Sequence, residues 1–220
     1  DVQIIFQDNM ASLDPKKRVI DIIAEPLRNF EKMTVTEERK RVLELLDIVG
    51  MPEDALYKYS FEFSGGQRQR IGVARAISLN PKLIIADEPV SALDLSVQAQ
   101  VLNFMKKIQK DMVLSYLFIS HDLGVVKHMC DYINIMYRGR LVERGTKEDI
   151  YKDPQHIYTK RLIAAIPETD PRLKEQLIAN RIKVEQEYKE LEKDYYDEKG
   201  KVFDLIKLTD THYVAKKEVK

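Results

Sequence analysis

Two adjacent carboxylates, Asp87 and Glu88, follow the apolar run at residues 83–86. Such a run is typical of a strand buried on both faces of a parallel sheet, and open α/β sheets bind ligands where these strands end. Charge at this place is costly unless something uses it. The chemistry indicates that Asp87 binds Mg²⁺, mostly through water, and that Glu88 deprotonates an attacking water. A solvated strand-end pair is the alternative, but it fits poorly with the Pro89 and Ser-Ala-Leu-Asp turn that follow.

A glycine-containing turn upstream is a second candidate site, made of Ser64, Gly65, Gly66 and Gln67. Glycines let a backbone approach an anion closely, and the following helix offers free N–H groups at its positive dipole end. The alternative is an ordinary helix N-cap that contains glycine. A bare Ser-Gly-Gly favours that alternative, whereas the longer string SGGQRQR is more specific.

Two further polar side chains stand at the ends of β-prone runs. The run at residues 116–119 ends in Ser120, His121 and Asp122, and the run at residues 2–6 ends at Gln7. Without further motifs, the more common interpretation of His121 is a hydrogen-bonded structural residue. For Gln7 it is a position in a hairpin or at a loop edge. We expect Asp122 to cap the helix that follows it.

Helical patterns must position these groups. Residues 19–23 have helical spacing before Pro26, and a clearer helix is predicted to begin near Thr36 as N-cap. Its apolar stripe ends at Gly50. Further predicted elements are helices at about 65–79 and 96–110, a hairpin turn at Arg138-Gly139, a helix starting at residues 146–149, and another over residues 162–166.

Four strings fall in one order along the chain: SGGQRQR, LIIADEP, SALD and ISHD. Together they resemble the signature, Walker B, D-loop and switch-histidine segments of an ABC-transporter ATPase, with Phe63 where leucine is commoner. The resemblance implies an α/β fold, in which a RecA-like parallel sheet core carries a helical subdomain at about residues 15–75 and a small C-terminal appendage.

The resemblance also implies a role for each candidate residue. Gln7 would lie near Mg²⁺ and the γ-phosphate of ATP, and His121 would contact that phosphate. The signature residues 64–67 would bind the ATP held by an opposite subunit, and the D-loop residues Ser91 and Asp94 would communicate across that dimer. ATP and Mg²⁺ are therefore the expected cofactors, with Asp87 and Gln7 near the metal and Glu88 and His121 as catalytic residues.

The C-terminal string PQHIYTKRLIAAIP is similar to an element of peptide-transporter ATPases, with Ile157 where proline is commoner. It implies oligopeptide import, with a second ATPase subunit, two transmembrane permease subunits and an extracytoplasmic substrate-binding protein reached through the permease. The expected location is peripheral, on the cytoplasmic face of the membrane. We predict an ATPase region at residues 1–152 and a peptide-transporter extension at 153–220.

The extension contains a highly charged stretch at residues 181–201, which indicates a solvated helix. Val184, Tyr188, Leu191 and Tyr195 form a narrow apolar seam along it. This seam could pack on the ATPase core or on a partner, and we expect the former. Residues 202–208 are β-prone, so we expect a small helix–strand appendage, to which no function is assigned.

Composition limits the alternatives. Lys plus Arg and Asp plus Glu both number 36, so no overall field favours nucleic acid as a partner. The single cysteine, Cys130, excludes an internal disulfide, and no apolar run approaches the about 20 residues that span a bilayer. Two other classes remain open: a soluble ABC-type ATPase of translation or DNA repair, and a non-hydrolysing regulatory subunit.

A phosphate-binding loop of the form GxxxxGK[ST] does not occur in the 220 residues, which begin at Asp1 inside a β-prone run. We interpret the chain as a fragment of a protein that carries this loop upstream. The 220-residue chain alone is predicted to bind ATP very weakly and to catalyse no turnover.

Overall fold

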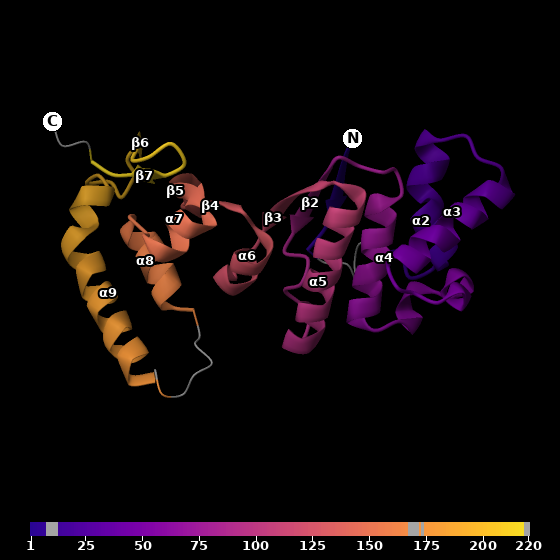
Figure 1. Ribbon diagram of the computed structural model, residues 1–220, viewed down its shortest axis with the longest axis horizontal. Coiled ribbons are helices and arrows are strands. Elements are labelled where there is room, and N and C mark those ends of the chain that lie inside the picture. Colours follow the sequence, from indigo (N-terminus) through magenta and orange to yellow (C-terminus); the bar gives the residue numbers. More distant parts are fainter. Residues whose placement is uncertain (8–12, 167–171, 173, 218–220) are drawn as a thin grey trace. The chain divides into compact units, whose positions relative to one another are not determined.

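The computed structural model describes residues 1–7, 13–166, 172 and 174–217 (Figure 1). They form two compact units, Asp1–His121 and Asp122–Lys220. The division predicted between residues 152 and 153 follows the motifs of the chain, and it stays a prediction.

The first unit is built on a parallel sheet with strand order β1-β2-β3. Its strands are β1 (Val2–Ile5), β2 (Leu83–Asp87) and β3 (Ser115–Ile119). Ile5 pairs with Ala86, and Asp87 pairs with Ile119. The carboxyl ends of all three strands therefore meet at one edge, where Gln7, Glu88 and His121 follow them in the chain.

Helices of this unit bury the apolar stripes that the sequence shows. They are α2 (Val19–Phe30), α3 (Val35–Ile48), α4 (Gly65–Ile77) and α5 (Leu95–Met112), with short 3₁₀ turns η1 (Glu53–Tyr57) and η2 (Ser60–Glu62). Helix α2 continues through Pro26 to Phe30, where the burial of Leu27 offsets the hydrogen bond that proline cannot make.

The predicted cap at Thr36 is wrong. Thr34 is the N-cap of α3, because its side chain accepts from the backbone N–H of Glu37 and Glu37 accepts in return from the N–H of Thr34. This reciprocal pair is a capping box, which needs an acidic residue or glutamine three positions after the threonine. Thr36 has Arg39 at that position.

The second unit contains an antiparallel sheet of order β4-β5-β7-β6. Its strands are β4 (Tyr132–Tyr137), β5 (Arg140–Thr146), β6 (Leu205–Lys207) and β7 (Tyr213–Ala215), and its helices are α6 (Leu123–Met129), α7 (Lys147–Lys152), α8 (Ile157–Ala164) and α9 (Lys174–Tyr195). The predicted turn at Arg138 and Gly139 is confirmed, since both residues have positive φ, 48° and 76°. Asp122 caps α6, also as predicted.

Helix α9 lies beside α8 and packs on the core of this unit (Figure 1). Its seam residues Tyr188, Leu191 and Tyr195 join a cluster that includes Ile133 and Val142 of the hairpin. The seam therefore packs inside the second unit, and its packing on the ATPase core stays a prediction. Pro167, which was expected to stop the helix of residues 162–166, lies outside the described residues. Across the part of the chain that the structure describes, no helix has the length and apolarity to cross a membrane.

Candidate functional site

Three predicted site residues meet at the carboxyl edge of the parallel sheet. The amide Nε2 of Gln7 donates to Oε2 of Glu88 at 2.7 Å, and Nδ1 of His121 lies 2.9 Å from Oε1 of the same carboxylate. Gln7 and His121 stand 81 and 33 residues from Glu88 in the sequence. Both carboxylate oxygens are thus engaged by side chains that the parallel strands bring together.

The backbone of Glu88 is bent out of the strand. Its φ is 43°, in the left-handed region that non-glycine residues seldom adopt. A residue before proline also favours the extended conformation, so Pro89 makes this bend more unusual. The N–H of Glu88 still donates to the carbonyl of Ile119 at 2.9 Å, which anchors the bend to β3. Backbone strain of this kind gathers at functional sites and fixes a side chain in place.

Electrostatics favour the ionised form of Glu88. The hydrogen bond from His121 lowers the pKa of this carboxyl below its ordinary value, with smaller contributions from Gln7 and Ser91. The Glu88 side chain is 22% exposed and that of His121 is 73% exposed, so both are open to solvent and to a ligand. The arrangement keeps the carboxylate next to an imidazole and in the ionised form, which is the protonation state that a general base requires.

Asp87 ends β2 next to Glu88 and is half-buried. With its Nε2 on Glu88, Gln7 keeps its amide oxygen as an acceptor. A carboxylate and an amide oxygen are hard oxygen donors of the kind that Mg²⁺ takes, so these two residues fit that ion. Among the described residues, no group of three or more His, Cys, Asp or Glu side chains is arranged to hold a metal. An ion here would therefore keep several waters, as Mg²⁺ commonly does.

The predicted D-loop folds back on Glu88. The hydroxyl of Ser91 donates to the carbonyl oxygen of Glu88 at 3.1 Å, and the N–H of Ser91 reaches the same oxygen at 3.2 Å. Asp94 is the exposed N-cap residue of α5. The loop is therefore a tight turn that joins the end of β2 to the start of α5.

The predicted signature residues form the start of α4. Ser64 is its N-cap and makes a capping box with Gln67: Ser64 Oγ accepts from the Gln67 N–H at 3.3 Å, and Gln67 Oε1 accepts from the Ser64 N–H at 3.0 Å. Gly65 and Gly66 are the first two helical residues. Their N–H groups have no carbonyl four residues earlier within the helix, which leaves the helix start able to bind an anion.

Sequence reasoning missed the residues on which the signature turn rests. Leu93 and Val97, from the D-loop and the start of α5, lie against the two signature glycines. The helical spacing of the apolar residues in this helix does not indicate which of them meet the glycines.

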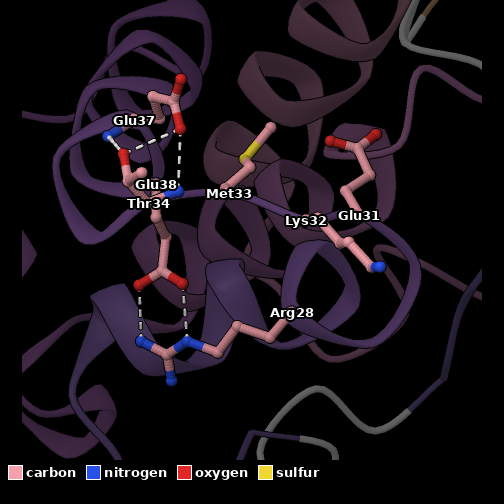
Figure 2. A pocket seen from close by; sticks show the side chains of 7 residues that line it. All are labelled: Arg28, Glu31, Lys32, Met33, Thr34, Glu37 and Glu38. Carbon is pink, nitrogen blue, oxygen red and sulfur yellow. Dashed lines mark hydrogen bonds and ion pairs between the residues drawn. The ribbon is translucent and has the colours of Figure 1, made fainter.

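A hollow of about 470 Å³ lies elsewhere in the first unit, around the connection from α2 to α3 (Figure 2). Figure 2 shows Arg28 facing Glu38, and two N–H···O contacts of 2.7 Å join them. Glu37 is taken up by the cap of Thr34. Because Arg28 and Glu38 are paired with each other and none of the predicted site residues lines the hollow, we assign it a role in joining the two helices.

A second glutamate–histidine pair lies inside the second unit. Glu143 on β5 is fully buried, and its Oε1 lies 2.7 Å from Nε2 of His212. The same carboxylate accepts from the N–H groups of Gln155 at 2.7 Å and His156 at 3.0 Å. It therefore ties the start of α8 and the segment before β7 to β5. No motif predicted this cluster, since Glu143 and His212 are single polar residues 69 positions apart.

Two protein-family models match this chain, one in its N-terminal part and one in its C-terminal part. Residues 1–91 match the ABC transporter family, and residues 142–203 match the oligopeptide/dipeptide transporter C-terminal region. The chain is 60% identical to the oligopeptide transport ATP-binding protein OppF of Lactococcus lactis, over 98% of the chain and 67% of that protein. It is 52% identical to OppF of Escherichia coli, over 79% of the chain and 52% of that protein.

Solved structures agree on the fold. The chain superposes on cbiO1 of Clostridium perfringens, part of the ABC transporter complex cbiONQ, with a TM-score of 0.65 at 25% identity, covering 80% of this chain and 67% of that one. It superposes on the ATP-binding cassette MJ0796, a dimer bound to ADP and Pi, with a TM-score of 0.58 at 27% identity, covering 67% and 63%. The predicted α/β fold with a RecA-like core is confirmed.

Proposed function

Because the chain belongs to the family of oligopeptide transport ATP-binding proteins of ABC transporters, we propose that it forms part of a subunit that hydrolyses ATP to power oligopeptide uptake across the cytoplasmic membrane. The observation that carries this proposal is the convergence of Gln7, Glu88 and His121 at the carboxyl edge of the parallel sheet. A regulatory subunit without hydrolysis would have no need to keep a strained, ionised glutamate at that place.

Glu88 is the proposed general base. Its carboxylate is ionised at neutral pH, since its pKa lies below the ordinary value. Each of its oxygens has a second lone pair, so a water can donate to it beside Gln7 or His121 or after one of them has left. Positioned general bases contribute about 10²- to 10⁴-fold in rate. The left-handed backbone at Glu88 keeps this side chain at the sheet edge while its partners exchange.

Asp87 and Gln7 would hold Mg²⁺ beside the phosphates of ATP. Bound Mg²⁺ would neutralise the charge that develops as a phosphoryl group is transferred. If Gln7 turns its amide oxygen toward the ion, the hydrogen bond from its Nε2 to Glu88 changes at the same time. Occupation of the site would thereby release one oxygen of the proposed base.

His121 is proposed to contact the γ-phosphate. With its Nδ1 on Glu88, the imidazole donates a hydrogen bond from Nε2 only when both nitrogens carry protons. A carboxylate on one side and a phosphate on the other favour that cation. The histidine would then stabilise negative charge on the phosphate while holding the carboxylate in place.

Residues 64–67 are proposed to contact the ATP of an opposite subunit, with Ser91 and Asp94 at the contact between subunits. The dimeric structure of MJ0796 supports a dimer of ATP-binding domains. We propose a heterodimer that works with two permease subunits and, through them, a substrate-binding protein, on the cytoplasmic face of the membrane. The names of the OppF relatives support oligopeptides as cargo.

Co-purification of the full-length protein from membranes tests this proposal. We expect two permease subunits and a second ATPase to accompany it, and we expect ATP hydrolysis to rise when peptide-loaded substrate-binding protein is added. Recovery with ribosomes, or no hydrolysis in the purified complex, would contradict the proposed function.

The 220-residue chain provides a second test. It lacks a GxxxxGK[ST] loop, whose backbone and lysine make most β- and γ-phosphate contacts in this class of ATPase. We therefore expect no turnover from the isolated chain, and robust hydrolysis by it would show that those contacts come from residues described above.

A further inference from the structure

The two signature glycines are not required by their backbone conformation. Among the described residues, the glycines with positive φ are Gly50, Gly139 and Gly200, whereas Gly65 and Gly66 have the ordinary conformation of a helix start. Alanine is more favourable than glycine within a helix. Some other constraint must therefore keep side chains away from positions 65 and 66.

That constraint is the close approach of the D-loop and α5. A Cβ atom added to Gly66 would lie 2.5 Å from Cγ1 of Val97, a separation that carbon atoms cannot tolerate. A Cβ added to Gly65 would lie 3.2 Å from Cδ2 of Leu93, a tight contact that a small movement of leucine relieves. Both places are thus filled by side chains of the same chain, and the requirement is stricter at Gly66.

Helices α4 and α5 also meet farther along. The guanidinium of Arg70 lies 5.1 Å from the ring centroid of Phe104, and its Nη1 donates to the carbonyl of Val49 at 2.9 Å. The contact at Gly66 is therefore one end of an interface that continues from residue 66 to residue 70 on α4 (Figure 1). Helix α5 cannot move away from the signature turn without disturbing this second contact.

The same segment is tied to the proposed general base. Ser91 bonds to the carbonyl of Glu88 through both its hydroxyl and its N–H, and the N–H of Leu93 donates to the carbonyl of Val90 at 3.1 Å. A short, internally bonded turn thus connects Glu88 with Leu93 and Val97. This turn joins Glu88, which is proposed to act on the ATP of its own subunit, to residues 64–67, which are proposed to contact the ATP of the opposite subunit.

We propose that Val97, assisted by Leu93, is a positioning residue that holds the signature turn at residues 64–67 in fixed relation to Glu88. Its γ-methyl group occupies the space left by the absent side chain of Gly66. This role rests on the function proposed above, because it links the two half-sites of a dimeric ATPase within one subunit. Neither residue is expected to touch nucleotide.

Size exchange between the two helices tests the proposal in the full-length protein. Gly66→Ala should lower the unfolding temperature by about 3 °C or more and the rate of hydrolysis at saturating ATP about tenfold or more, because it overpacks the contact. Adding Val97→Ala should restore most of both losses. The matched control is Val101→Ala, which removes the same atoms from a buried position on the same helix and should restore neither.

Two further variants keep the test decisive if Gly66→Ala does not fold. Gly65→Ala should lower the unfolding temperature and the rate by smaller amounts, because its Cβ would lie farther from Leu93 than a Cβ at Gly66 lies from Val97. Val97→Ile enlarges the contact from the other side and should lower the rate in a protein that still folds. Unchanged unfolding temperature and rate in Val97→Ile would overturn the proposal.

The double variant separates the possible outcomes. If Gly66→Ala with Val97→Ala stays as impaired as Gly66→Ala alone, the glycine is not required by Val97 and the proposal is wrong. Recovery of the unfolding temperature without recovery of the rate would overturn the positioning role. If the unsubstituted full-length protein hydrolyses no ATP, the proposed function fails, while the unfolding temperatures, measured without nucleotide, still test the contact.

Discussion

The two units contain the same pair of side chains in opposite surroundings. Glu88 and His121 lie 2.9 Å apart with side chains 22% and 73% exposed, whereas Glu143 and His212 lie 2.7 Å apart with side chains 0% and 4% exposed. The exposed carboxylate is bound by two side chains. The buried one is bound by a histidine and two backbone N–H groups.

Burial decides what each pair does. An exposed pair contributes at most about 1 kcal/mol to stability, so it breaks easily and its members are available to a ligand. A buried polar group must stay hydrogen-bonded, and each buried donor or acceptor left without a partner costs about 1–3 kcal/mol. The first pair is therefore suited to exchange partners during a reaction. The second joins α8 and the segment before β7 to β5.

The largest effect on stability is expected at the buried carboxylate. Glu143→Ala leaves three donors, His212 and the N–H groups of Gln155 and His156, without their acceptor, and should destabilise the second unit by about 3–5 kcal/mol. Hydrogen exchange measured on peptides from each unit should show the loss in residues 122–217. The control Glu148→Ala, at an exposed glutamate on α7, should change exchange little. Equal protection in the two variants would refute the structural role of Glu143.

Acid is expected to destabilise the second unit more than the first, which is the next largest effect. Burial lowers the pKa of His156 from 6.5 to about 4, so the unfolded chain takes up this proton before the folded one. The second unit should lose up to about 3 kcal/mol as the pH falls from 6.5 to about 4. The lowered pKa of Glu88 affects the first unit only at a pH below the ordinary pKa of a glutamate.

Hydrogen exchange across that pH range, corrected for its intrinsic pH dependence, measures this difference. His156→Asn retains an acceptor for the N–H of Tyr158 and should remove the acid-dependent loss. A loss of the same size in the variant would assign the effect to another group.

Substitution of His212 and of His121 should give stability losses that differ by less than the effects above. His212→Asn removes one partner of a fully buried carboxylate and should cost about 1–3 kcal/mol. His121→Asn breaks the exposed pair and should change the free energy of unfolding by less than about 1 kcal/mol. Denaturant unfolding of both variants provides the comparison, and equal losses would mean that burial does not distinguish the pairs.

The smallest difference is expected between two helix caps. Thr34→Ala and Thr146→Ala each remove a capping box, worth about 1 kcal/mol. In the second unit Asp149 also accepts from the hydroxyl of Thr211 at 2.9 Å, so the loss of Thr146 should disturb a second contact. We expect Thr146→Ala to lower the unfolding temperature more than Thr34→Ala does; the reverse order would contradict this reading of Asp149.

The same contrast explains what could be predicted from the sequence. Gln7, Glu88 and His121 were predicted as candidates because each follows an apolar run, and parallel strands bring such ends together. The hairpin at Arg138 and Gly139 and the cap at Asp122 depend on neighbouring residues and were predictable as well.

Long-range contacts could not be predicted in this way. Nothing in the periodicity of residues 140–146 pairs Glu143 with a histidine 69 positions later. The glycines at positions 65 and 66 suggested approach to an anion, but the sequence does not show that Val97 and Leu93 fill the space beside them. The cap at Thr34 is different, because the spacing of Thr34 and Glu37 is visible in the sequence and already indicates a capping box there, whereas Thr36 lacks such a partner.

Single-turnover hydrolysis by the full-length complex tests the central claim most directly. Glu88→Gln should bind ATP with an affinity close to that of the unsubstituted protein and cleave it about 10²- to 10⁴-fold more slowly. Glu143→Gln, measured per folded molecule, should cleave at the unsubstituted rate. Cleavage by Glu88→Gln at the unsubstituted rate would contradict the assignment of the exposed pair to catalysis.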